Sequence, residues 1–244
     1  MVVAAKNIVD LGSATGSATR ALKKRFRGAR VISVDLSSNM LRQGLAKQSW
    51  LAKSPAIQAH ATALPFADQS VDVVFANLLL PWIDDPAELF TEVARVLRKD
   101  GLLMFATLGP DSLLELRRAW QAADDFAHVN RFLDMHDIGD ATVKAGLRDP
   151  VLDVDRMSVT YSSPDKLFQD LTSVAGRNSL NGRNPAMVSK ARFERVIDAL
   201  EAAMIGDVLT LNLEFVYGHC WGCGPRAPAG DFLIDASRIG RRTR

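Results

Sequence analysis

The stretch NIVDLGSATG, residues 7–16, decides the fold because it joins a short apolar run to a glycine-bounded turn. Asn7–Leu11 is rich in β-branched and apolar residues and stops at Gly12, which predicts a buried strand. Beyond Ser17, apolar residues recur at helical intervals as far as Phe26, so a helix follows the turn. Strand, glycine turn and helix in this order begin a βαβ unit, whose turn can present backbone N–H groups to a ligand.

The same alternation continues along the chain. The further segments that read as strands are residues 31–34, 71–76, 102–108, 151–161 and 209–221. Those that read as helices are residues 38–53, 86–97, 111–123 with Asp111 as the cap, 135–145, 164–174 and 185–204. This order predicts an α/β fold with a mostly parallel sheet and an antiparallel edge hairpin, the late helices being inserted over the carboxyl ends of the strands. We expect residues 1–150 to form the cofactor-binding core, and residues 151–244 to complete the sheet of the same domain.

Composition excludes several classes of function. The 244 residues are 48% hydrophobic and 24% charged, with a net charge of +2, which is too small to indicate nucleic-acid binding. No apolar run reaches the roughly 18 residues that span a bilayer, and the start lacks a secretory leader, so we predict a cytoplasmic protein without membrane contact. Cys220 and Cys223 alone provide neither a disulfide framework nor a zinc site, and no metal is expected.

The turn between Asp10 and Gly16 favours one kind of nucleotide ligand. Asp35 ends the second predicted strand about 20 residues further on, where a carboxylate can accept hydrogen bonds from ribose hydroxyls. A nicotinamide dinucleotide would need a third glycine to admit its pyrophosphate, and Asp10 would repel that group. The same carboxylate can help to orient an ammonium group. An adenosine ligand that carries an amino acid therefore fits better than a dinucleotide.

Four blocks together resemble the class I S-adenosylmethionine-dependent methyltransferases, which have a Rossmann-like seven-stranded sheet. The blocks are VDLGSATG at 9–16, VDLSSNM at 34–40, LPFADQSVDVV at 64–74 and LRKDG at 97–101. The resemblance implies that Asp10 and the glycine turn hold the methionyl part, that Asp35 holds the ribose, and that Asn77 contacts cofactor or substrate. The cofactor-binding residues that it implies are Asp10, Gly12, Ser13, Gly16, Asp35, Leu36, Met40, His60, Ala61 and Asn77.

Two residues depart from the family pattern. Ala14 occupies the place of a second glycine, and its methyl group would crowd the cofactor unless the turn shifts. His60 stands where relatives have the acid that receives the adenine amino group, so it would have to accept through one ring nitrogen. Both departures predict a weakened affinity for the cofactor.

Blocks outside the cofactor core resemble the malonyl-acyl-carrier-protein O-methyltransferases of biotin synthesis. They are LGPDSLLELR at 108–117, HVNRFLDMHDIG at 128–139, GRNP at 182–185 and YGHCW at 217–221. The resemblance implies an enzyme that methylates the free carboxylate of a malonyl thioester on acyl carrier protein or on coenzyme A. Such a carboxylate is already ionised at neutral pH, so no catalytic base is required and no catalytic residue is named. Arginines suit the binding of a carboxylate, and Arg131, Arg177 and Arg183 are the candidate substrate-binding residues.

Other interpretations remain open at this point. A respiratory-complex assembly protein that looks like an arginine hydroxylase shares part of the first substrate block, and another small acid could be the substrate. Ala14 and His60 also fit a catalytically silent protein that binds a partner. The first predicted strand begins within ten residues of Met1, where the family usually has N-terminal helices, so we expect either a truncated start or a lost lid.

Overall fold

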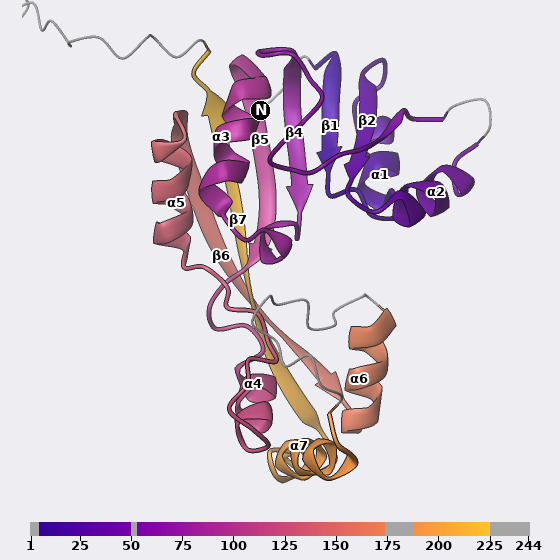
Figure 1. Cartoon of the computed structure of the whole chain (residues 1–244), viewed down its shortest axis with the longest axis vertical. Coiled ribbons are helices and arrows are strands. Elements are labelled where there is room, and N and C mark those ends of the chain that lie inside the picture. The colour runs from indigo at the N-terminus through magenta and orange to yellow at the C-terminus, as the bar shows by residue number, and fades with distance from the viewer. Residues whose placement is uncertain (1–4, 50–52, 174–187, 225–244) are drawn as a thin grey trace, which may run out of the picture.

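The computed structural model describes residues 5–49, 53–173 and 188–224. Figure 1 shows an upright sheet with helices on both sides and a lower lobe carried by the ends of its two longest strands. The strands are β1 (Asn7–Leu11), β2 (Arg30–Asp35), β3 (Ala56–Gln58), β4 (Val71–Asn77), β5 (Leu97–Leu108), β6 (Leu147–Tyr161) and β7 (Leu209–Gly222). The helices are α1 (Ser17–Arg25), α2 (Ser38–Ala46), the short 3₁₀ helix η2 (Leu80–Trp82), α3 (Pro86–Val96), α4 (Leu114–Gln121), α5 (Met135–Lys144), α6 (Pro164–Ser173) and α7 (Lys190–Ala202).

The seven-stranded sheet has the order β3-β2-β1-β4-β5-β7-β6. The first five strands run parallel, whereas β7 lies between β5 and β6 and runs antiparallel to both. The prediction of a mostly parallel sheet with an antiparallel edge hairpin is therefore confirmed. The chain leaves β1 for β2 on one side and later returns to β4 on the other, so a crevice opens at the carboxyl end of β1, where ligands bind in such sheets.

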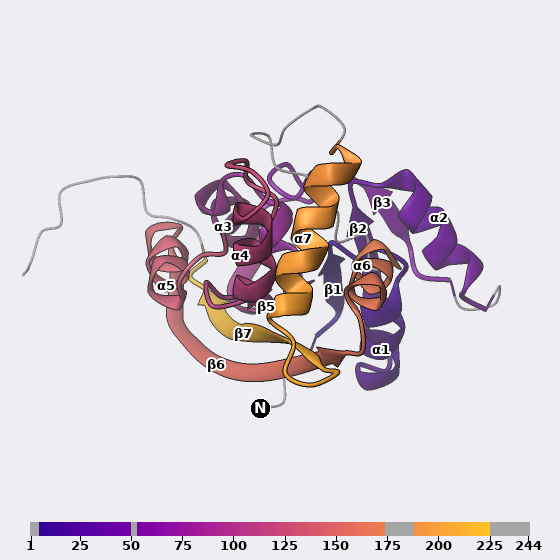
Figure 2. The ribbon, with the colours of Figure 1, turned by 90° about the horizontal axis from the view of Figure 1, so that it is seen from below.

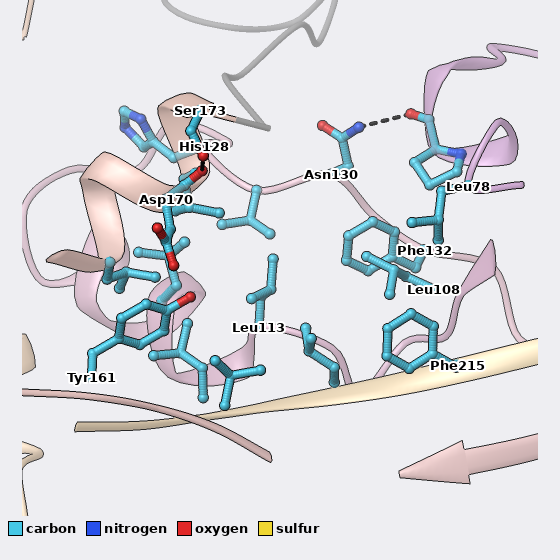
Figure 3. Close-up of a pocket in the computed structure, with 18 of the residues that line it drawn as sticks. Leu78, Leu108, Leu113, His128, Asn130, Phe132, Tyr161, Asp170, Ser173 and Phe215 are labelled. Atoms are coloured by element: carbon cyan, nitrogen blue, oxygen red, sulfur yellow. Dashed lines mark hydrogen bonds between the residues drawn. The ribbon is translucent and has the colours of Figure 1, made fainter. Parts of the chain in front are cut away.

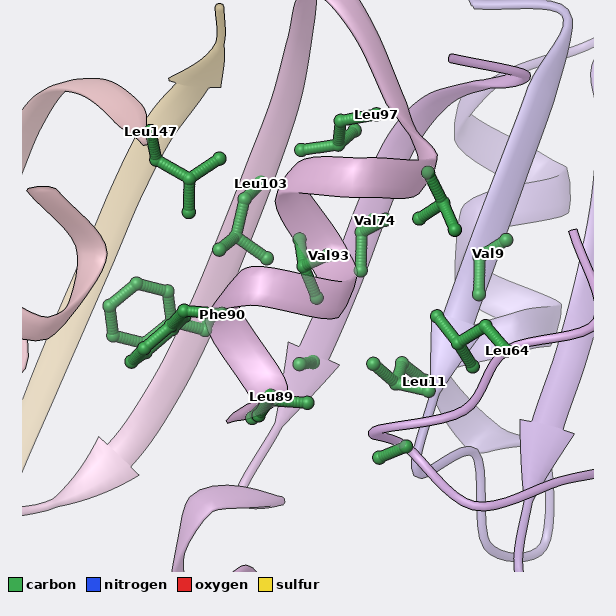
Figure 4. Packing of buried hydrophobic residues seen from close by; sticks show 14 of the residues in the cluster. Val9, Leu11, Leu64, Val74, Leu89, Phe90, Val93, Leu97, Leu103 and Leu147 are labelled. Atoms are coloured by element: carbon green, nitrogen blue, oxygen red, sulfur yellow. The ribbon is translucent and has the colours of Figure 1, made fainter. Parts of the chain in front are cut away.

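The main core lies between the sheet and the helices α3 and α5. Val74 and Leu103 of the strands pack with Phe90 and Val93 of α3, and Val9 lies in the same buried cluster beside Leu64, as Figure 4 shows. Each of these side chains is almost completely buried, and burial of one such side chain stabilises the fold by roughly 1.5–3 kcal/mol. This core fixes the carboxyl ends of β1 and β4 relative to each other.

A second core lies beyond the carboxyl end of β5. β7 pairs with β5 only between Phe215 and Trp221, but it continues to pair with β6 down to Leu209. This projecting ribbon carries the lower lobe, in which α4, α6 and α7 pack together (Figures 1 and 2). The fully buried residues of this cluster are Leu116, Ala119, Ala123, Leu167, Val196, Leu200, Leu209 and Leu211.

Two predicted helix ends are wrong. The helix predicted at 38–53 ends at Ala46, because the chain turns back there and the Ser54 N–H donates to the side chain of Gln48 at 2.7 Å. Asp111 does not cap α4, which begins at Leu114 with Leu113 as its N-cap; the Asp111 N–H donates to the Glu214 carboxylate at 3.0 Å, and the Asp111 side chain pairs with Arg156 at 3.4 Å.

One strand was missed, and other boundaries also differ from the sequence prediction, among them the start of β6 at Leu147 instead of 151. β3 is only three residues long, which is too short for a hydrophobic pattern, and the sequence did not reveal it. β5 begins five residues early, at Leu97, and passes through Asp100 in a left-handed conformation. α7 begins at Lys190 with Ser189 as its cap, whereas the first predicted residues of this helix, 185–187, lie outside the described residues. Within the described ranges, no helix is both long and apolar enough to cross a bilayer.

Candidate cofactor and acceptor site

The glycine turn lies at the carboxyl edge of the sheet, between β1 and α1. Gly12 and Gly16 have positive φ angles of 73° and 72°, which glycine adopts without steric cost. The N–H groups of Gly12 and Ser13 both donate to the Val34 carbonyl, at 2.8 and 3.0 Å, and so tie the turn to β2. A Cβ atom on Gly12 would lie 2.9 Å from Cδ1 of Leu79, so a side chain at this position would force Leu79 to shift.

Asp10 is buried behind this turn, with 1% of its surface exposed. The hydroxyl of Thr19 donates to its Oδ2 in a short hydrogen bond and also lies 2.9 Å from the Ser33 hydroxyl. Burial raises the pKa of Asp10, and hydrogen bonds from Thr19 oppose the rise. The carboxylate therefore joins the end of β1 to α1 and β2, and so supports the turn from within.

Asp35 ends β2 beside the turn, as the sequence predicted. Its two carboxylate oxygens accept the backbone N–H groups of Ala14 and Ser37, each at 2.8 Å. A carboxylate offers about four lone-pair positions, so each oxygen can accept a further donor. Leu36 follows with 62% of its surface exposed, and Met40 lies partly buried in the first turn of α2. The Asp35 carboxylate can accept hydrogen bonds from ribose hydroxyls, and the exposed Leu36 side chain next to it can contact the face of a base.

His60 and Ala61 lie after β3, on the same side of the sheet edge. Nδ1 of His60 accepts the Thr62 N–H at 3.3 Å and lies 2.8 Å from the Thr62 hydroxyl. Because Nδ1 accepts this N–H, the neutral ring carries its proton on Nε2, which is then a donor. Ala61 is buried. His60 thus offers a donor where the family acid offers an acceptor.

One contact that supports the turn was not predicted from the sequence. A Cβ atom on Gly44 of α2 would lie 3.2 Å from the carbonyl carbon of Thr15, so α2 approaches the back of the turn closely. Arg20 also donates to the Thr15 carbonyl at 3.0 Å. A glycine at position 44 of a predicted helix was the only available signal, since glycine is unfavourable there without a packing reason.

The end of β4 connects the turn to a cavity. Asn77 is the last residue of β4 and is exposed, and Leu78 follows with a positive φ of 54° and an N–H that donates to the Ala106 carbonyl at 2.8 Å. Leu78 lines the cavity, whereas its neighbour Leu79 lies against Gly12. The segment Leu78–Leu79 therefore contacts the cofactor turn on one side and the cavity on the other.

The cavity has a volume of about 520 Å³ and lies between the carboxyl edge of the sheet and the lower lobe. Figure 3 shows that its walls come from segments that are distant in the sequence. Most lining side chains are apolar, and they belong to the η2 region, the loop before α5, α4, α6 and the ends of β5, β6 and β7. They include Leu78, Leu108, Leu113, Phe132, Leu167, Leu211 and Phe215.

A few polar side chains stand out in this apolar lining. Asn130 donates from Nδ2 to the Pro81 carbonyl at 2.7 Å. At the other end, burial raises the pKa of the Tyr161 hydroxyl, and the hydrogen-bonded Asp170 carboxylate adds to the rise. His128 also borders the cavity, and Asp124 binds its Nε2 at 2.7 Å. The sequence reasoning named none of these as a site residue, although Asn130 falls in the HVNRF block.

The predicted substrate arginines do not line this cavity in the described structure. Arg131 is exposed, although its neighbours Asn130 and Phe132 both line the cavity. Arg177 and Arg183 lie outside the described residues. Among the described residues, no lysine or arginine lines the cavity.

The two cysteines show no arrangement for chemistry. Cys220 is buried in β7, which raises the pKa of its thiol to about 12, and Cys223 is exposed. Within residues 5–49, 53–173 and 188–224, no three His, Cys, Asp or Glu side chains gather as a metal site would require.

Comparisons with known proteins agree with this geometry. The model of a methyltransferase domain family matches residues 9–105. A malonyl-acyl-carrier-protein O-methyltransferase from Gallionella capsiferriformans is 39% identical over 225 residues, which cover 90% of this chain and 78% of the relative. One from Halorhodospira halophila is 39% identical over 98% of this chain and 83% of its own length, and one from Legionella pneumophila is 37% identical over 90% and 78%.

Solved structures share the fold at low sequence identity. The YcgJ protein of Bacillus subtilis is 16% identical, with a TM-score of 0.64 over 91% of this chain and 94% of that protein. A phosphoethanolamine N-methyltransferase of Haemonchus contortus, solved with S-adenosyl-L-methionine, gives a TM-score of 0.55 over 91% of this chain and 50% of that protein, also at 16% identity. These likenesses support the Rossmann-like arrangement of the sheet.

Proposed function

The chain belongs to the malonyl-acyl-carrier-protein O-methyltransferase family, and from this membership we propose that it methylates the free carboxylate of a malonyl group carried on acyl carrier protein. S-adenosylmethionine is the methyl donor. The observation that carries the proposal for this chain is the position of the cavity, which is lined by Leu78, the neighbour of the residue that packs against Gly12 of the glycine turn.

The turn has the features that this cofactor requires. Gly12 adopts a left-handed φ of 73°, and an added Cβ would meet Leu79, so a side chain here would disturb the turn that presents backbone N–H groups to the ligand. Asp35 keeps acceptor capacity for ribose hydroxyls, and Leu36 offers an exposed apolar surface to the adenine. We therefore assign the cofactor contacts to the residues expected from the sequence other than Asp10, including Ser13, Gly16, Met40, His60, Ala61 and Asn77.

Asp10 has a role that differs from direct binding. Its carboxylate is buried and bound by Thr19, so it supports the turn whose backbone meets the methionyl group. Burial raises the pKa of Asp10 because it disfavours the charged form of the carboxylate. An amide at this position would remove that buried charge.

When bound, S-adenosylmethionine supplies a methyl group on a sulfonium that leaves as a neutral thioether. The malonyl carboxylate is the nucleophile, and with a pKa near about 4 it needs no general base. The tasks left to the protein are to align the carboxylate with the methyl group and to exclude water from it. The apolar walls formed by Leu78, Phe132 and Phe215 perform the second task.

The substrate arginines remain part of the proposal. Arg131 adjoins the cavity lining at Asn130 and Phe132, where it can attract an anionic acceptor toward the opening. Arg177 and Arg183 keep the role that the sequence suggests. Biotin synthesis as the pathway and the cytoplasm as the location also belong to this proposal.

The decisive experiment incubates the full chain with S-adenosylmethionine and malonyl carrier protein. Mass spectrometry should detect a methyl ester on the malonyl group, whereas an acetyl carrier protein, which has no free carboxylate, should stay unchanged. Calorimetry with the cofactor alone provides the control for binding. Cofactor binding without ester formation would contradict the proposal, and methylation of another small acid or modification of a protein arginine would redirect it.

A further inference from the structure

We propose that Asn130 binds the acceptor carboxylate directly and holds it against the transferable methyl group. The inference rests on the proposed function, which supplies the reaction, but the residue is chosen from the geometry of the cavity. Asn130 is the polar side chain at the end of the cavity nearest to Leu78, and Figure 3 shows it on the same side as Leu78 and Phe132.

Asn130 is fixed at both its side chain and its backbone. Its Nδ2 donates to the Pro81 carbonyl at 2.7 Å, which joins the loop before α5 to the segment that follows β4. Its own carbonyl accepts from Arg117 of α4 at 3.0 Å. An amide nitrogen has two hydrogens, so one N–H remains for a ligand after the bond to Pro81. The remaining donor is preorganised because its partner hydrogen is already bound.

A neutral donor suits this reaction. No lysine or arginine is found in the cavity lining among the described residues, so the positive charge that an entering carboxylate meets at this end is the sulfonium of the bound cofactor. An arginine that gripped both oxygens would hold the anion tightly but would also reduce its tendency to attack. One amide N–H can hold the oxygen that does not attack and leave the other oxygen exposed to the methyl group.

The charges at the far end of the cavity support the same orientation. Asp170 and Tyr161 line the end opposite Asn130, where Asp170 carries a negative charge and raises the pKa of the tyrosine. A carboxylate is repelled from that end and accepted at the Asn130 end. The malonyl group is therefore directed with its free carboxylate toward the cofactor turn.

The test compares Asn130→Asp with Asn7→Asp. The aspartate at 130 keeps the size of the side chain, removes the donor and adds a like charge. Asn7 is the matched control, because its Nδ2 also donates to a backbone carbonyl, that of Ser70, at the opposite end of β1. We expect kcat/KM for malonyl carrier protein to fall by roughly 100-fold in Asn130→Asp and by less than about threefold in Asn7→Asp. Cofactor affinity should change little in either variant.

A binding measurement separates this role from a structural one. The malonyl substrate is an anion, whereas its methyl ester product is neutral at the same position. Asn130→Asp should weaken binding of malonyl coenzyme A, used as the probe, by roughly 10-fold or more, but binding of its methyl ester by less than about threefold. Equal loss for both ligands, or no loss for the anion, would overturn the inference. These binding data decide it even if the wild type forms no ester, a result that would count against the proposed function alone.

Discussion

The cofactor edge and the acceptor cavity lie side by side, yet they are built in different ways. The cofactor edge consists of residues close to strand ends in the first part of the chain, and backbone N–H groups hold it, such as those of Gly12 and Ser13 on Val34. The cavity is enclosed by side chains from η2, the loop before α5 and the lower lobe. Backbone hydrogen bonds hold the cofactor edge in shape, whereas the packing of side chains from distant segments forms the cavity.

This difference determines how mutations should act. A backbone site is sensitive to φ angles and to the space above glycines, and it tolerates changes in distant packing. A packing site depends on the second core, which holds β6, β7, α4, α6 and α7 together. The two regions should therefore be damaged by different mutations.

The largest effect is expected from Leu200→Ala in α7. Leu200 is fully buried in the second core, and such truncations destabilise a protein by about 2–5 kcal/mol. The damage should reach the cavity, so KM for the malonyl carrier rises, while calorimetry finds the cofactor affinity unchanged. Ile205→Ala is the control, because Ile205 is 87% exposed. If cofactor affinity fell in parallel with acceptor binding, the two regions would form one unit.

Gly12→Ala should have the opposite profile. The left-handed φ costs about 1–2 kcal/mol for alanine, and the new Cβ would lie 2.9 Å from Leu79. We expect cofactor affinity to fall by roughly 100-fold, or about 2.7 kcal/mol. Gly28→Ala is the matched control, since Gly28 has a φ of 89° with no atom within 4 Å of the added Cβ. Both variants lose stability, measured by urea unfolding, but only Gly12→Ala should lose the cofactor. Equal cofactor affinities would contradict the assignment of the turn.

Asp35→Asn should weaken cofactor binding by a smaller factor. The amide keeps one acceptor oxygen but turns an NH₂ group toward the N–H of Ala14 or Ser37, and it loses the charge that strengthens bonds to ribose hydroxyls. A loss of roughly 10- to 100-fold follows, measured by calorimetry. Asp85→Asn, at the N-cap of α3, perturbs a comparable bond to the Ala87 N–H and should leave the cofactor affinity intact. A similar loss in both variants would mean that Asp35 acts through stability.

The same difference explains what the sequence could predict. The turn, Asp35 and the strand order rest on local patterns, because a strand end and the following helix start are neighbours in the chain. The sequence patterns predicted the projecting ends of β6 and β7, at 161 and 209, but not the pairing of these strands with β5 or the packing of the helices that turns the projection into a cavity. Tyr161 and Asn130 meet the same cavity only through this projection. The prediction of Asp111 as a helix cap was wrong for the same reason. The Asp111 N–H donates to the carboxylate of Glu214, a residue so distant in the sequence that no local pattern could reveal the contact.

His60→Asp tests the departure at the adenine position. His60 accepts the Thr62 N–H through Nδ1 and presents a donor from Nε2, whereas an aspartate could accept both the Thr62 N–H and an adenine amino group. We expect cofactor binding to tighten by about two- to fivefold, since one exposed hydrogen bond contributes about 0.5–1 kcal/mol. His60→Asn, which has an acceptor oxygen but no charge, should give an intermediate value. Weaker binding in His60→Asp would show that the histidine is itself adapted to this cofactor.

Ala14→Gly should produce the smallest effect, opposite in sign to that of Gly12→Ala. Ala14 has a φ of 44° while its N–H donates to Asp35, so the turn keeps the family's glycine geometry with a residue that disfavours it. Glycine removes about 1 kcal/mol of backbone strain from the folded state. It also lowers the free energy of the unfolded chain by about 0.4–1 kcal/mol, because glycine has more conformational entropy there, so the free energy of unfolding should barely change.

Cofactor affinity should nevertheless rise by about two- to threefold, because the removed methyl group no longer crowds the ligand. Gln69→Gly is the control, since Gln69 has a similar φ of 53° near the opposite end of β4 and should show the same balance in stability with no change in affinity. If Ala14→Gly weakened cofactor binding, the methyl group would be a contact of the bound cofactor, and the alanine side chain would belong to the cofactor-binding residues of this edge.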